Sequence, residues 1–133
     1  MGTQIVNLWP EDIGRDVDQS TPLTILKQQA SLLGQRTKNL VEAKVISEMD
    51  GEFFVHSFIL VAPALGHYRY LLFRVLHKLD IYPVQIKTDL ETKQIRPQYT
   101  ADTEDIFIDQ LKEVFSSEKT RKIIDTLLAM SQK

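Results

Sequence analysis

Three histidines are the residues of this chain best suited to chemistry by type: His56, His67 and His77. Their spacing matches no metal-ligand motif, and the chain holds no Walker, GxGxxG or GxSxG pattern. Ser57 follows His56 in sequence, but adjacent residues of a strand face opposite ways, so we do not expect a nucleophile and base there. The sequence therefore predicts no catalytic residue, no metal and no cofactor. An enzyme assembled from distant residues remains the less favoured alternative.

Basic and aromatic side chains interleave between His67 and Lys78. Such a run can stack on bases and contact phosphates of single-stranded nucleic acid. The net charge of −2 argues against that partner, because no block of the chain is basic enough to attract a phosphate backbone. We keep Tyr68, Arg69 and Tyr70 as candidate binding residues for a protein or a small molecule. Arg69 and Arg74 have odd spacing, which predicts opposite faces of a strand and therefore no shared site.

The longest apolar pattern is a hairpin over residues 40–62. Asp50-Gly51 is typical of a two-residue type I′ turn, which predicts that Met49 faces Glu52 and that Val45 faces His56. In this register one face is almost entirely apolar. We expect that face to carry the core, with His56 as a hydrogen-bonded core histidine.

The second strand of this hairpin is apolar on both sides, which a sheet with one solvent-exposed face does not require. On the face away from the predicted core, the apolar residues are Phe53, Val55, Ile59 and Val61. They alternate with charged side chains of the first strand, a mixture typical of a binding surface. We predict that these four residues form an interface or line a pocket.

Residues 1–20 are expected to form an extension of a single domain at residues 21–133. The extension carries one basic and four acidic groups, hence a charge of −3, and the only tryptophan, Trp9. We favour packing of Trp9 on the chain's own core. The alternative is that the segment clasps another chain, because tryptophan is enriched at binding hot spots. No secretory signal, membrane-spanning run or cysteine is present, so we expect a cytoplasmic protein that does not enter a membrane.

The elements predict an α+β fold, and 133 residues with 43% hydrophobic content are enough for one core without disulfides. A helix should begin at Pro22, capped by Ser20 or Thr21, and end near Gly34. Helices over 103–115 and 118–131 should close the chain.

Two segments between these helices are predicted to complete an antiparallel meander of about four strands. Residues 65–79 place their leucines on one arc of a helical wheel, yet their aromatic and β-branched residues favour a strand. We predict a strand and keep a helix as the alternative. Residues 81–87 form the predicted fourth strand, and Pro83 favours an edge position because it cannot donate a ladder hydrogen bond. A polar connector should span residues 88–101.

The two-sided strand favours a small protein-binding or regulatory module that forms a homodimer, because a twofold interface pairs one surface with itself. The first helix is apolar on two sides, with Ile25 and Leu32 away from its main stripe, which favours the same function. The alternative is a small-molecule-binding domain, with catalytic activity left open. Its pocket would lie under the sheet, lined by Phe54, Phe58, Tyr68 and Tyr70.

Overall fold

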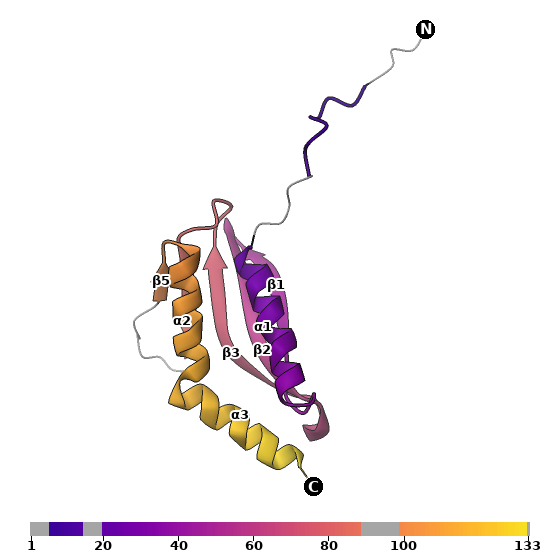
Figure 1. Ribbon diagram of the computed structural model, residues 1–133, viewed down its shortest axis with the longest axis vertical. Helices are drawn as coiled ribbons and strands as arrows, with labels where there is room; N and C mark the ends of the chain where they lie inside the picture. Colours follow the sequence, from indigo (N-terminus) through magenta and orange to yellow (C-terminus); the bar gives the residue numbers. More distant parts are fainter. Residues whose placement is uncertain (1–5, 15–19, 89–98, 133) are drawn as a thin grey trace.

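The computed structural model describes residues 6–14, 20–88 and 99–132. It has an N-terminal helix, a five-stranded antiparallel sheet and two C-terminal helices (Figure 1), which confirms the predicted α+β fold. The elements in chain order are α1 (Pro22–Arg36), β1 (Glu42–Asp50), β2 (Phe53–Ala62), η1 (Pro63–Leu65), β3 (Tyr68–His77), β4 (Val84–Thr88), β5 (Tyr99–Ala101), α2 (Glu104–Ser116) and α3 (Glu118–Ser131). Strands that follow one another in sequence are neighbours throughout the sheet.

Local chemistry sets the start and the end of α1. The Thr21 hydroxyl accepts the backbone N–H of Thr24 at 3.2 Å, and Pro22 needs no N–H partner in the first turn. The helix ends at Arg36, and Lys38 and Asn39 then both adopt positive φ angles. These two residues reverse the chain, so that α1 packs along β1.

The β1–β2 register differs from the predicted one by two residues. Met49 pairs with Phe54 and Ser47 pairs with His56, because the tight turn falls on Gly51 and Glu52 instead of Asp50 and Gly51. Gly51 has a φ of +61°, the left-handed conformation that this turn position requires. A shift by two residues keeps each side chain on its predicted face, so the predicted assignment of faces holds although the pairs were wrong.

A register irregularity in the β2–β3 pair corrects a second prediction. Phe58 pairs with Phe73 and Ile59 pairs with Leu71, which leaves Leu72 as an extra residue of β3. An extra residue inverts the alternation of side chains along the rest of the strand. Arg69, which pairs with Val61, and Arg74, which pairs with Ser57, therefore lie on the same face of the sheet, contrary to the odd-spacing argument.

Residues 68–77 form strand β3, so the helical alternative for 65–79 is wrong. Strand β4 starts only after Pro83, and it lies inside the sheet because β5 pairs with it; the predicted edge position is wrong. The short strand β5 falls within the predicted polar connector, of which residues 89–98 lie outside the described residues.

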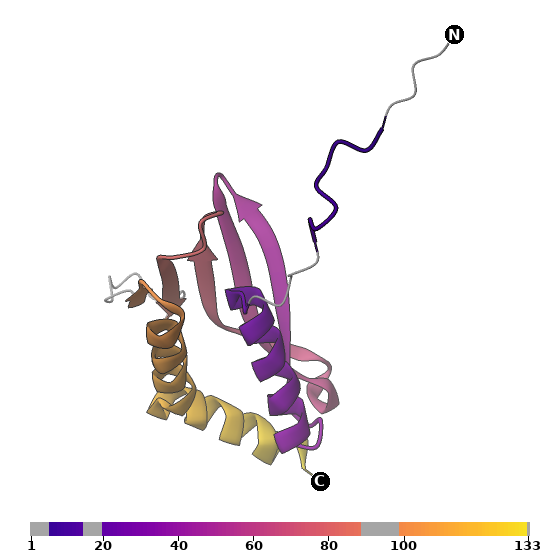
Figure 2. The ribbon, with the colours of Figure 1, turned by 45° about the horizontal axis from the view of Figure 1, so that its top comes forward.

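The three long helices lie on one side of the sheet, as the two views of Figures 1 and 2 show. The core between these layers centres on three phenylalanines. The rings of Phe58 and Phe73 stack with centroids 5.1 Å apart, and Phe115 of α2 packs against both. Within the described residues, no helix has the length and apolar character needed to cross a membrane.

Candidate binding surfaces

The face of the sheet that points away from the helices, here called the outer face, carries the four apolar residues predicted as an interface. Val55 and Val61 are buried there, although they are not part of the core cluster beneath the helices. Phe53 and Ile59 are half-buried. Other apolar side chains extend this surface, namely Ile46 of β1 and Leu71 and Leu76 of β3. No helix among the described residues covers the outer face (Figure 2).

Charged side chains lie on both sides of the apolar centre of the outer face, mainly acidic on β1 and basic on β3. Glu42 and Glu48 lie on β1, with Lys44 between them. Arg69 and Arg74 lie on β3, and Arg74 pairs directly with Lys87 of β4. Like charges at directly opposed positions are unfavourable unless something compensates them.

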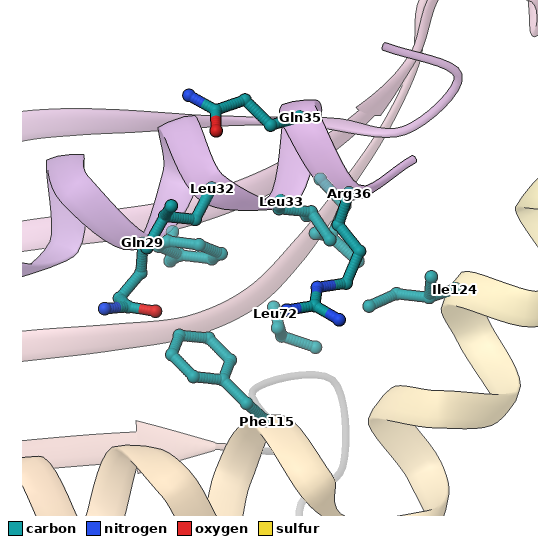
Figure 3. Close-up of a pocket in the computed structure, with 10 residues that line it drawn as sticks. Gln29, Leu32, Leu33, Gln35, Arg36, Leu72, Phe115 and Ile124 are labelled. Carbon is teal, nitrogen blue, oxygen red and sulfur yellow. The ribbon is translucent and has the colours of Figure 1, made fainter. Parts of the chain in front are cut away.

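The helix side of the sheet holds an open cavity of about 600 Å³, here called the α1 groove. Its floor consists of Phe58, Leu60 and Leu72, and its lining continues with Gln29, Leu32, Leu33, Gln35 and Arg36 of α1, Phe115 of α2 and Ile124 of α3. Figure 3 shows the Arg36 side chain extending across this groove toward Leu72 and Ile124. Within the described residues Arg36 makes no ion pair, so its guanidinium lies in this mainly apolar groove without an acidic partner.

A second cavity of about 560 Å³, here called the α3 cavity, lies between α3 and the start of β3. Tyr68 and Tyr70 line it together with Leu65, Lys122, Ile123, Thr126, Leu127 and Met130. Two of the four residues of the predicted pocket therefore meet here. Phe58 instead lies in the α1 groove, and the Phe54 ring stacks on His77.

The predicted binding residues thus fall into three places. Four apolar residues and Arg69 share the outer face, and the two tyrosines line the α3 cavity on the opposite side. Trp9 belongs to neither surface: its side chain is 69% exposed, so in this structure it does not pack on the core, contrary to the favoured prediction. Binding at these residues stays a prediction.

His56 lies at the centre of a chain of hydrogen-bonded polar groups on the helix side, in which the two histidines are buried and Ser47 is exposed. Ser47 Oγ lies 2.7 Å from His56 Nδ1, His56 Nε2 lies 2.9 Å from His77 Nε2, and His77 Nδ1 lies 2.9 Å from the carbonyl oxygen of Lys78. The carbonyl can only accept, so His77 Nδ1 carries a proton. In the tautomer whose only ring proton is at this nitrogen, His77 Nε2 accepts from His56 Nε2, and His56 Nδ1 accepts the hydroxyl proton of Ser47.

This arrangement favours a neutral His56 ring. Burial, then repulsion from His77 and from Lys27, together lower the pKa of His56 to about 4. A base this weak activates the neighbouring Ser47 hydroxyl poorly at neutral pH. The contacts therefore support a structural role for the chain of hydrogen bonds, in line with the prediction of a core histidine at this position.

Two members of this chain were missed in the sequence. Ser47 was paired with the wrong residue because the turn was placed one position early, and the correct register puts it opposite His56. His77 was expected to be solvated in a turn, yet it is the last residue of β3 and is buried. Within the described ranges, no group of three or more His, Asp or Glu side chains could hold a metal ion.

Comparison with known proteins assigns no relative to this chain. None of the protein-family models, curated proteins or solved structures with which it was compared matches it. The functional argument therefore depends on the surfaces described above.

Proposed function

We propose that this chain is a small cytoplasmic protein-binding module that forms a homodimer through its outer face. The observation that supports this proposal is an apolar sheet face with no helix over it, bordered by acids on one side and bases on the other. A face with an apolar centre and charged borders is typical of a protein interface. Two sheets can pack face to face at about 10 Å with their strands nearly aligned.

The order of charges on this face is self-complementary under a twofold axis that runs along β2 between two copies. Such an axis places β2 over β2 and β1 of each copy over β3 of the other. The apolar centres then meet, with Val55, Ile59 and Val61 on both sides. Glu42 and Glu48 of one copy come over the strand that carries Arg69 and Arg74 in the other, which stabilises this pairing over alternatives.

A lysine at Ile46 tests this interface. Ile46 is 43% exposed on the outer face, and Ile46→Lys is expected to weaken the dimer by about tenfold or more, because it buries an unpaired charge between the two sheets. Sedimentation velocity over a micromolar concentration series gives the dissociation constant. Ile106→Lys on α2 is the matched control, because Ile106 is 41% exposed on the helix side, and it should leave the dimer intact.

Charge reversal tests the pairing of strands. Arg69→Glu should weaken the dimer, and adding Glu42→Arg in the same chain should restore it. Dimers of equal strength in all these variants, or a wild-type monomer at every concentration, would exclude the outer face as the interface.

The α3 cavity supports a second candidate function, the binding of a small apolar molecule, because predicted pocket residues Tyr68 and Tyr70 line it together. Its volume lies within the range of ligand sites. A bound compound should raise the unfolding midpoint in a thermal-shift screen of small apolar and aromatic compounds. Tyr68→Ala should abolish that shift, whereas Leu79→Ala, at an exposed position outside the cavity, should keep it. An unchanged shift in Tyr68→Ala would place the compound elsewhere.

A further inference from the structure

The described part of the N-terminal extension, residues 6–14, presents apolar side chains to solvent. Leu8, Trp9 and Ile13 are all strongly exposed. The backbone N–H groups of Trp9 and Ile13 donate to neighbours within the extension, Asn7 Oδ1 and the carbonyl oxygen of Pro10. Exposed tryptophan and leucine beside one another are unfavourable in water, so this segment is suited to bind an apolar surface.

The same segment carries negative charge between its apolar side chains. Glu11 and Asp12 stand between Trp9 and Ile13. The α1 groove has the opposite chemistry, an apolar floor beneath the unpaired guanidinium of Arg36 (Figure 3). A guanidinium binds a carboxylate well, because the pairing is charge-assisted and can be bidentate.

We propose that residues 8–13 dock into the α1 groove of their own chain, with Trp9 over Phe58 and Leu72 and the carboxylates near Arg36. Docking describes a second arrangement of the chain, since in this structure Trp9 lies outside the groove. It goes beyond the proposed function, because the groove and the outer face lie on opposite sides of the sheet. The groove volume of about 600 Å³ accommodates a tryptophan side chain with an aliphatic neighbour.

The length of the connecting chain allows this docking. The eight peptide units between residues 13 and 21 span at most about 28 Å when extended. Helix α1 rises about 21 Å from Pro22 to Arg36, so the near end of the groove at Gln29 is well within reach. A short tether gives a docking segment an effective concentration in the millimolar range, which favours its own groove over that of another molecule.

Trp9 reports on docking directly, because it is the only tryptophan of the chain. In the full-length protein we expect its emission to be blue-shifted relative to free N-acetyltryptophanamide. Its acrylamide quenching constant should also be several-fold lower. Arg36→Glu should remove both effects, and so should the double variant Glu11→Lys with Asp12→Lys. Combining all three substitutions should restore them, because the charges are then exchanged between the same partners.

The controls separate docking from other causes. Arg121→Glu reverses an exposed cation of α3 outside the groove and should leave the Trp9 signal unchanged. Ile46→Lys should also leave it unchanged, so that loss of the dimer and loss of docking are distinguished. Emission and quenching equal to those of the free amide would overturn the proposal. Protection that appears only as protein concentration rises would overturn it too, because the extension would then bind a second copy.

Discussion

Replacing Phe73 by alanine should lower the free energy of unfolding by about 3–5 kcal/mol, the largest effect we expect from one substitution. Phe73 is completely buried and stacks on Phe58, and Phe115 of α2 closes over the pair. The deletion removes apolar burial and leaves a cavity that three elements cannot fill together. Urea denaturation followed by circular dichroism gives the change.

Phe53→Ala provides the matched control for this prediction. It deletes the same ring from the outer face, where Phe53 is half-buried and the Lys78 ammonium lies 5.3 Å from the ring centroid. We expect a loss of about 1 kcal/mol, because solvent can fill the space that the ring leaves. Equal losses in the two variants would show that the outer face is as well packed as the core.

Acid should destabilise this protein through His56, by about 3 kcal/mol between pH 7 and pH 4. The pKa of His56 is about 4 in the folded chain against 6.5 for an unperturbed histidine. Between these values the unfolded chain binds a proton that the folded chain does not, so stability falls as pH falls. Each unit of pKa difference corresponds to about 1.4 kcal/mol. Ser47 of β1, His77 of β3 and Lys27 of α1 are the polar groups around the ring, and none supplies a negative charge that would stabilise the imidazolium.

Denaturation curves across this pH range test the assignment. In His56→Gln the pH dependence should become several-fold weaker, from a lower starting stability at pH 7 because the chain of hydrogen bonds is altered. His67→Gln is the control, because His67 is exposed and should leave the pH dependence as in the wild type. An unchanged slope in His56→Gln would show that another group titrates.

In the hairpin, the sequence pattern predicted the face of each side chain but not the pairing of residues across the strands. Alternation of apolar residues along 53–62 assigned each side chain to its correct face, although the pairs themselves were displaced by two residues. A period of two fixes the face but not the register, which depended on where Gly51 adopts its positive φ. Because the turn was misplaced, the contact between Ser47 and His56 was missed, and the hydrogen-bonded chain from Ser47 through His56 to His77 was not predicted.

For the two arginines of β3, the sequence pattern gave the wrong faces. Their spacing predicted different faces, and the extra residue Leu72 placed both on the outer face. No single residue type signals such an irregularity, because it arises from fitting two twisted strands together. The basic border of the outer face, and with it the charge pattern behind the proposed dimer, became visible only in the sheet.

The sequence by itself determined the α+β class, the three long helices, the core face of the hairpin and the two-sided character of β2, because these features depend on periodicity and capping close along the chain. Only the tertiary structure decided what covers each face of the sheet. It placed α1, α2 and α3 on the same side, left the outer face without a helix from the described residues, and opened the α1 groove beside Arg36. The physical reason is that a helix can pack on either face of a sheet, and the choice depends on contacts between residues far apart in the chain.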